Sequence, residues 1–309
     1  MPIDQKVLDF VHQNLVATDN EVIKPLADYT YTRDIPIKND LSKVVRAVIQ
    51  TRITGGAGQG TQAMAGRSWV NLKANDLKSV SLETSAEAVP VMTGGREASW
   101  TELEVEEAQA YNLNLTSEKV SIINDIFNQE AQYVGYLGDT ENGVTGLLNS
   151  ASVETDVGDG LLKAASPDVA KIIKALDAAM RLSQEVADDV IVPSTLLVSP
   201  AQYMTLFSLK MPDDNKVSLI DYLEKQSYAA KYRGGFKVFQ VKELAGIGDS
   251  SSDRMLFYTP DLRYVKYSML PCWRYKNWEL KTEIGATYLW RLAQVQLRHP
   301  ETLLYVDNL

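Results

Sequence analysis

GYLGDTENGVTGLLN, residues Gly135 to Asn149, is the stretch of sequence that decides the fold. It directly follows a long amphipathic segment, and four glycines interrupt it. Glycine tolerates positive φ and close backbone approach, so this spacing predicts the end of a helix followed by a compact, shaped turn. The pattern indicates architecture and offers no catalytic chemistry. Its candidate structural residues are Gly135, Gly138, Asp139, Gly143, Gly146 and Asn149.

Two helices are predicted immediately upstream of this turn. Thr101 and Glu104 have the spacing of a capping box, which predicts a short helix from Glu102 to Tyr111. A longer helix is predicted from residues 116–117 to Gly135, because apolar residues recur there at helical spacing. Its predicted buried face consists of Val120, Ile123, Phe127, Ala131 and Val134.

The chain downstream of the turn alternates between helical and strand patterns. A helix is predicted from Pro167 to about Val190, with Ser166 as its N-cap. VIVPSTLLV, residues 190–198, has the pattern of a buried strand, and a helix through Tyr203 and Phe207 follows it. Further segments predict a helix over 219–227, a strand at FKVFQV, and strands throughout from Met255 onward. The sequence therefore predicts a mixed α+β fold.

The first hundred residues are less regular. A possible amphipathic helix lies around Val7 to Val16, and the proline-containing run from Lys24 to Asn39 reads as an extended arm. Leu41 to Ile53 fits a strand or a short helix. The following Thr54 to Ser68 is rich in glycine and small residues, which predicts a mobile loop tip within a long β-rich excursion that reaches Met92.

Composition excludes several classes of protein. The 309 residues carry a net charge of −9, so there is no global positive field to attract nucleic acid, and a sequence-specific DNA reader is not expected. Cys272 is the single cysteine, which excludes an intramolecular disulfide framework and a cysteine-rich zinc site. We expect no signal peptide, no membrane span, and synthesis in a reducing cytoplasm.

The patterns that could carry chemistry do not form a site. GGAGQG, Gly55 to Gly60, lacks the lysine of a phosphate-binding loop and the spacing of a dinucleotide fingerprint, so no nucleotide or other cofactor is expected. His12 and His299 are the only histidines and lie near opposite ends of the chain. The acids at 102–107, 188–189 and 213–214 fit solvated faces, because consecutive acids on a helix point in different directions. We expect no catalytic set and no metal site.

One further pattern combines aromatic and basic residues near the C-terminus. Such a pattern could stack on single-stranded nucleic acid. We favour an antiparallel sheet with one wet face as its explanation. The residues concerned are Arg274, Tyr275, Lys276, Trp278 and Lys281.

In order and in motif, these segments resemble the Hong Kong 97-like major capsid proteins of tailed phages and prophages, and the related encapsulins. Gly138-Asp139 and the Gly-Leu-Leu-Asn run at 146–149 are similar to the family's turn after its spine helix. HPETLLYVDN, His299 to Asn308, is similar to the final segment of one capsid subgroup. The resemblance implies an α+β capsid fold with an N-arm, an extended β loop, a peripheral domain with a long spine helix, and an axial α/β domain.

The resemblance also implies domain boundaries. The N-arm is expected at residues 1–50, the extended loop at 51–95, the peripheral domain at 96–137 and 254–309, and the axial domain at 138–253. The glycine-rich turn is then a structural hinge between the domains. The loop expected to overlap a neighbouring subunit includes Gly55, Gly56, Gly58, Gly60, Arg67 and Trp69.

The function implied is structural and not enzymatic. The chain is expected to assemble through pentamers and hexamers into an icosahedral shell around double-stranded DNA, which it contacts without reading its sequence. Portal, scaffold and decoration proteins are the further partners implied, and the virion is the expected location after synthesis in the host bacterial cytoplasm. Two alternatives stay open: an encapsulin-type compartment around cargo enzymes, and an unrecognised hydrolase that uses the clustered acids.

Overall fold

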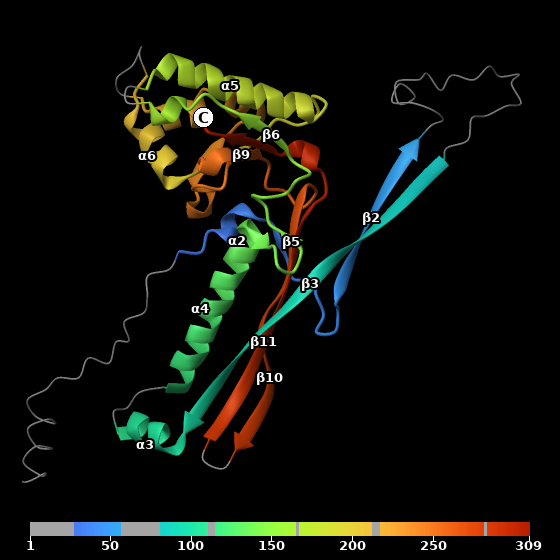
Figure 1. Cartoon of the computed structure of the whole chain (residues 1–309), viewed down its shortest axis with the longest axis vertical. Helices are drawn as coiled ribbons and strands as arrows, with labels where there is room; N and C mark the ends of the chain where they lie inside the picture. The colour runs from blue at the N-terminus through green and yellow to red at the C-terminus, as the bar shows by residue number, and fades with distance from the viewer. Residues whose placement is uncertain (1–27, 57–80, 111–114, 165–166, 212–216, 281–282) are drawn as a thin grey trace, which may run out of the picture.

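The computed structural model describes residues 28–56, 81–110, 115–164, 167–211, 217–280 and 283–309. Within these ranges the chain forms two bodies of unequal shape (Figure 1). One is a long sheet with a helix along it, and the other is a compact α/β unit at one end of that sheet. The expected α+β class is confirmed.

The long sheet has the strand order β1-β10-β11-β3-β2. Strand β3, which lies between β11 and β2, changes partner along its length: residues 91–101 pair with β11, and residues 81–90 pair with β2. β1 joins β10 in parallel, whereas the other pairs are antiparallel. The strands are β1 (Ile37–Lys38), β2 (Ala47–Gly56), β3 (Ser81–Thr101), β10 (Val265–Leu280) and β11 (Glu283–Leu297).

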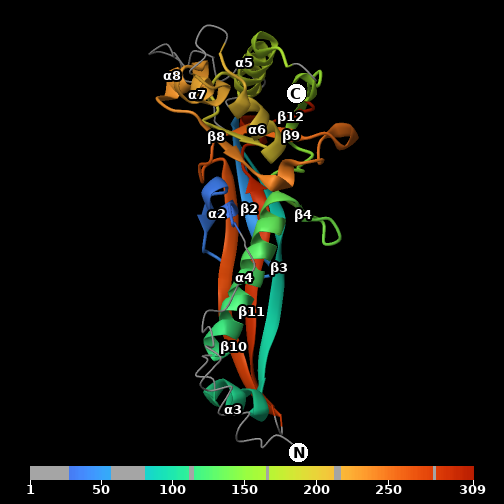
Figure 2. The same ribbon diagram turned by 90° about the vertical axis from the view of Figure 1, so that its left-hand side faces the viewer.

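Helix α4 (Leu115–Tyr136) lies along this sheet (Figure 2). Four of the five apolar residues predicted for its packed face, Ile123, Phe127, Ala131 and Val134, are buried against the sheet. The shorter helix α3 (Glu102–Ala110) precedes it, and its capping box is confirmed: Thr101 N donates to Glu104, and Glu104 N donates to Thr101 Oγ1. Residues 111–114, which join the two helices, lie outside the described part.

The second sheet has the order β6-β12-β9-β7-β8. Side chains alternate along β9 and β12: Leu256, Tyr258 and Tyr305 face the core beneath α4, whereas their neighbours face the helices of the compact unit. This sheet therefore contributes to both cores. Its strands are β6 (Glu154–Val157), β7 (Thr195–Val198), β8 (Lys237–Gln240), β9 (Arg254–Tyr258) and β12 (Leu304–Asp307).

Helices cover the outer side of this second sheet (Figure 2). They are α5 (Val169–Val186), α6 (Pro200–Ser208), α7 (Leu219–Lys225) and α8 (Tyr228–Arg233). Short 3-10 turns complete the unit: η2 (Leu161–Lys163), η3 (Lys242–Leu244), η4 (Asp249–Ser251) and η5 (Pro300–Thr302). Among the residues that the structure describes, no helix is both long and apolar enough to cross a membrane.

Three sequence predictions for this unit need correction. Helix α5 ends at Val186, because Asp188 and Asp189 both adopt positive φ and stop it. Asp168 caps its start by accepting from Ala170 N; the predicted cap, Ser166, lies outside the described residues. The strand predicted over 190–198 is shorter and begins at Thr195.

The expected domain boundary at residue 254 separates two strands from the sheet in which they pair. β9 and β12 lie within the range assigned to the peripheral domain, yet both pair in the second sheet. β12 joins β9 on one edge and β6 on the other, so the chain re-enters the compact unit at its C-terminal end. Pairing between strands so distant in sequence leaves no local signal for the boundary.

The N-terminal segment also differs from the extended arm predicted over Lys24 to Asn39. From residue 28 onward it forms helix α2 (Tyr31–Asp34) and strand β1. Tyr31 and Ile35 are buried in the core beneath α4. Ala47 to Gly56 is strand, which resolves the strand-or-helix alternative for that region, and Gly55 and Gly56 belong to it rather than to a loop tip. The helix predicted at Val7 to Val16 lies outside the described residues.

Candidate functional site

The candidate site is the junction between α4 and the second sheet, formed by the glycine-rich turn. Helix α4 continues one residue beyond Gly135, and the chain then folds back as a hairpin of β4 (Gly138–Asp139) and β5 (Val144–Thr145). Leu147 N donates to the Gly135 carbonyl, and Leu148 N donates to the Tyr136 carbonyl, both at 2.9 Å. These bonds satisfy carbonyls at the helix C-terminus that have no partner within the helix.

Asn149 and Asp139 hold the two ends of this turn. Asn149 Oδ1 accepts from Gly146 N at 2.8 Å, and Asn149 Nδ2 donates to the Leu137 carbonyl. Asp139 accepts from the Asn142 side chain at 2.6 Å and from Glu141 N at 3.1 Å. The Asn142 hydrogen bond lowers the pKa of Asp139, so its carboxylate stays charged as an acceptor.

Two of the glycines admit no side chain. A Cβ on Gly146 would lie 2.2 Å from the Tyr136 carbonyl oxygen, and a Cβ on Gly138 would lie 2.3 Å from the Val144 carbonyl oxygen. Gly138 also has a φ of +73°. Gly143 has a φ of +66° but no atom within 4 Å of such a Cβ. The compact turn predicted from the sequence is therefore confirmed, and close backbone packing is its physical basis.

An ion pair connects the turn to the C-terminal strand. Arg254 on β9 donates to both carboxylate oxygens of Asp307 on β12, each at 2.7 Å, and to the Leu148 carbonyl at 2.7 Å. The Asp307 side chain is 1% exposed and that of Arg254 is 13% exposed. Tyr305 supplies a second connection, since its hydroxyl donates to the Leu147 carbonyl at 2.6 Å.

Replacing Arg254 by methionine is expected to lower the free energy of unfolding by about 3 kcal/mol, because the Asp307 carboxylate is left buried without its cation. Urea unfolding followed by circular dichroism measures this. The double variant Arg254→Met/Asp307→Leu should recover part of the loss, because it removes the stranded charge as well. Equal losses in the single and double variants would show that packing, and not the buried charge, carries the effect.

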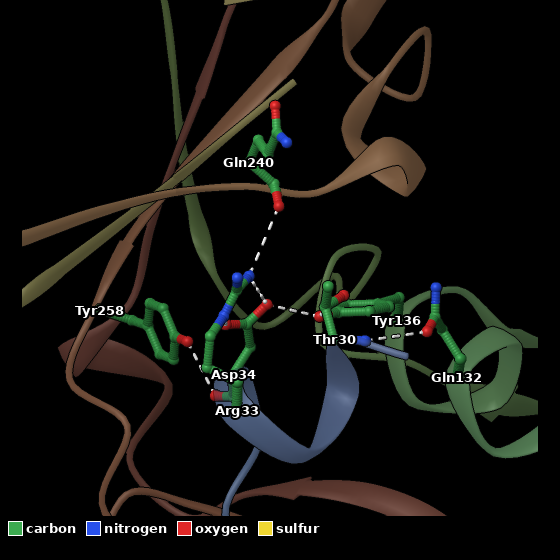
Figure 3. Close-up of polar contacts among 7 residues, drawn as sticks. All are labelled: Thr30, Arg33, Asp34, Gln132, Tyr136, Gln240 and Tyr258. Atoms are coloured by element: carbon green, nitrogen blue, oxygen red, sulfur yellow. Dashed lines mark hydrogen bonds and ion pairs between the residues drawn. The ribbon is translucent and has the colours of Figure 1, made fainter. Parts of the chain in front are cut away.

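A second polar cluster joins the N-terminal segment to both bodies (Figure 3). Asp34, whose side chain is fully buried, accepts from Tyr136 at 2.5 Å and from Arg33 at 2.6 and 2.9 Å. The Asp34 carbonyl accepts from Tyr258 on β9 at 2.8 Å. Thr30 adds hydrogen bonds to Tyr136 and Gln132 of α4. Asp34 therefore lies where α2, α4 and the second sheet meet.

Sequence reasoning missed the Asp34 cluster. Its acid and its two tyrosines are separated by about a hundred residues each, and the arm interpretation placed Asp34 in solvent. The available signal was Tyr-Thr-Tyr-Thr-Arg-Asp at 29–34, which is richer in aromatic residues than an arm needs. A single sequence offers no means of pairing these residues with Tyr136 and Tyr258.

The β2–β3 ribbon is the paired part of β2 and β3, residues 47–56 and 81–90. Among the described residues these two stretches pair only with each other, and they project beyond the rest of the long sheet and away from the compact unit (Figure 1). At about 3.3 Å per residue, the 21 residues of β3 span roughly 70 Å. Val44 and Ile49 at the base of the ribbon are 82% and 69% exposed. Gly58, Gly60, Arg67 and Trp69 of the expected overlapping loop lie outside the described residues.

The other motifs form no site in the described part of the chain. His299 is half-exposed and contacts Glu301 at 2.7 Å; His12 lies outside the described residues. No group of three or more histidine, cysteine, aspartate or glutamate residues within the described ranges could hold a metal ion. The aromatic-basic residues at 274–278 belong to the antiparallel pair β10–β11, as favoured from the sequence, and Trp278 packs against Gly285. Residues 274–277 are all exposed, so both faces of the pair meet solvent there, and not one face as predicted. Lys281 lies outside the described residues.

Comparison with known proteins decides the family. The sequence model of the family described as "Major capsid protein" matches residues 66–309 of this chain. The chain belongs to the major capsid protein family. No curated protein matches this capsid protein. It is a structural protein of phage-type shells and not an enzyme, and the hydrolase alternative is not favoured.

Solved structures support the fold. The capsid of Myoviridae phage XM1 superposes with a TM-score of 0.75 at 15% identity, covering 96% of this chain and 98% of that one. The capsid of the native GTA particle gives a TM-score of 0.65 at 10% identity, covering 99% of both chains. Mycobacterium phage Bobi gives 0.56 at 16% identity, covering 96% of both. The capsid protein therefore has the Hong Kong 97-like fold that the sequence resemblance implied.

Proposed function

We propose that this capsid protein assembles through pentamers and hexamers into an icosahedral shell that encloses double-stranded DNA, and that the β2–β3 ribbon of each subunit overlaps a neighbour. Membership of the capsid family supports self-association into a shell. A net charge of −9 is compatible with a wall that confines DNA without binding it tightly. The proposal also includes portal, scaffold and decoration proteins as further partners, and synthesis of the chain in the host bacterial cytoplasm.

The proposed overlap is supported by the unpaired outer edges of the ribbon. A two-stranded ribbon is at best marginally stable in water, and unpaired strand edges readily pair with other chains. In the part of the chain that the structure describes, neither outer edge of the ribbon pairs with a further strand over residues 47–56 and 81–90, and the apolar Ile49 side chain is exposed. A neighbouring subunit that covers the ribbon supplies the burial that the isolated chain lacks.

The domain assignment follows the observed sheets. We assign the extended loop to 47–90, the peripheral domain to α3, α4 and the rest of the long sheet, and the axial domain to the second sheet and its helices, with β9 and β12 included. The junction at Gly135 to Asn149 then sets the angle between the two domains. Its tight backbone contacts favour one fixed geometry, which a shell of repeated subunits requires.

Shortening the ribbon tests this function. Residues 49–88 are replaced by Asn-Gly, which closes the paired Val48 and Val89 with a two-residue hairpin turn. We expect a folded subunit with unchanged helix content that forms no particles, because the overlap is lost while both cores remain. Size exclusion and negative-stain microscopy measure assembly, with the full-length chain as control. Particles from the shortened chain would refute the overlap, and small compact monomers from the full-length chain under every condition would refute the shell.

A further inference from the structure

A groove of about 1290 Å³ lies between α4, β3 and the second sheet. Its wall includes Gln129, Glu130 and Tyr133 of α4, residues 90–94 of β3, and Lys242 and Glu243 of η3. Two more acids, Asp28 and Asp139, contribute to the lining. Four carboxylates and one ammonium therefore belong to the lining, a net charge of −3 (four negative, one positive). One of the four, Glu130, also has an ion pair with Arg96 at 3.7 Å. The groove attracts a positively charged occupant.

One of these carboxylates is incompletely paired. The Glu243 side chain is 9% exposed, and its Oε1 accepts from Gln132 Nε2 at 2.6 Å. Its Oε2 is buried and has no hydrogen-bond partner within the described part of the chain. A buried carboxylate oxygen without a donor is costly, and a neighbouring cation or donor removes that cost. Lys242 compensates little of the Glu243 charge, since its Nζ lies 3.7 Å from Oε1 and its side chain is 73% exposed.

Two segments of this chain have the length to fill the groove, and their charges differ. The segment between β2 and β3, residues 57–80, contains Arg67, Lys73 and Lys78 against Asp76, a side-chain charge of +2 (three positive, one negative). Residues 1–27 contain four acids (Asp4, Asp9, Asp19 and Glu21) against two lysines (Lys6 and Lys24), a charge of −2. Charge complementarity therefore favours the segment between the two strands.

Geometry makes this contact intermolecular. The ends of β2 and β3 that carry residues 57–80 point away from α4 and from the second sheet (Figure 1). We infer that the acidic groove beside α4 receives a basic side chain from the β2–β3 segment of a second copy, with Glu243 as the principal acceptor. This inference rests on the overlap proposed above. It identifies the groove of one subunit as the surface that the β2–β3 segment of its neighbour contacts.

Charge substitution tests the role of Glu243. Glu243→Gln keeps the shape of the side chain and its acceptor for Gln132 but removes the charge. We expect the subunit concentration needed for half-maximal particle formation to rise about tenfold, as loss of a charged contact worth about 1.4 kcal/mol predicts. Glu185→Gln on α5 removes an equal charge outside the groove and should leave assembly unchanged. Assembly of Glu243→Gln at the wild-type concentration would overturn the inference.

Cysteine crosslinking tests the partner. In a Cys272→Ser background, Gln129→Cys in the groove is mixed with a chain that carries Arg67→Cys, Lys73→Cys or Lys78→Cys, and the assembled particles are oxidised. Each chain then has one cysteine. A disulfide between the groove and the β2–β3 segment (a tip–groove disulfide) therefore appears as a covalent dimer under non-reducing electrophoresis. We expect a dimer with at least one tip position, and none when Arg181→Cys on α5, whose side chain is 80% exposed, replaces the groove cysteine.

The outcomes separate the two proposals. Particles without any tip–groove dimer refute this inference and leave the shell function intact. A dimer with Val7→Cys instead places the N-terminal segment in the groove and also refutes it. Failure of the Cys272→Ser chain and of the wild-type chain to form any particle removes the shell function and this inference together.

Discussion

Replacing Gly146 with alanine is expected to destabilise the subunit by at least about 4 kcal/mol, the range that marks severe backbone or core disruption. The added Cβ would lie 2.2 Å from the Tyr136 carbonyl oxygen and 2.7 Å from Gly138 N, and both atoms belong to the backbone of the turn. The Tyr136 carbonyl oxygen accepts the hydrogen bond from Leu148 N, so displacing it from the added Cβ would break that bond. Gly138→Ala should cause a similar loss, because its Cβ meets the Val144 carbonyl oxygen at a positive φ.

Gly143→Ala is the matched control. It shares the positive φ of Gly138 but has open space around the added carbon, so only the conformational cost of about 1 kcal/mol remains. Urea unfolding of the three variants measures the difference. Equal losses of unfolding free energy at positions 138, 143 and 146 would show that glycine is needed in this turn only for its conformational freedom. Close backbone packing would then not determine the turn.

Local patterns predicted the elements well. The capping box at Thr101 and Glu104 and the buried face of α4 both depend on residues within a few positions of each other, so the sequence contains their whole signal. The compact turn could be predicted for the same reason, since its contacts join residues within the short range 135–149. Ser199 and Gln202 likewise form a capping box at α6, where a helix after Ser199-Pro200 was predicted.

Contacts between distant segments could not be predicted in this way. Asp34 pairs with Tyr136 across 102 residues, and Arg254 pairs with Asp307 across 53. In each case the partner is chosen by the topology of the sheets, so an acid such as Asp34 looks the same in sequence whether it is buried or solvated. The place of β9 and β12 in the second sheet could not be predicted for the same reason, because β12 pairs with β6 and β9 only in the folded chain.

Four buried tyrosines hold these distant segments together, and each donates its hydroxyl to another element. Tyr136 donates to Asp34, Tyr258 to the Asp34 carbonyl, Tyr267 to the Ala131 carbonyl, and Tyr305 to the Leu147 carbonyl. Burial raises the pKa of all four phenols, and in Tyr136 and Tyr258 the Asp34 carboxylate raises the pKa further. These hydroxyls cannot ionise without losing the contacts that join α4 to both sheets.

The raised pKa values predict unfolding in alkali. The unfolded chain releases its phenolic protons near pH 10 while the folded chain keeps them, so stability is complete below pH 10 and falls above it. Each tyrosine removes about 1.4 kcal/mol per pH unit, so the four together remove about 5.6 kcal/mol per pH unit. Urea unfolding between pH 9 and 11.5 measures this slope. Exposed tyrosines such as Tyr275 ionise in the folded chain, whereas tyrosinate absorbance from the four buried residues should appear only as the chain unfolds.

Single substitutions assign the slope to these residues. Tyr305→Phe should lower the free energy of unfolding at pH 8, because the Leu147 carbonyl loses its donor, yet it should also reduce the alkaline slope by one proton. Tyr275→Phe, at a side chain that is 66% exposed on β10, is the matched control and should change neither quantity. Tyrosinate absorbance from the four buried residues in a chain that is still folded would contradict the prediction. The contact region between α4 and both sheets, where these four hydroxyls lie, would then open locally before global unfolding, since the phenols ionise only where water reaches them.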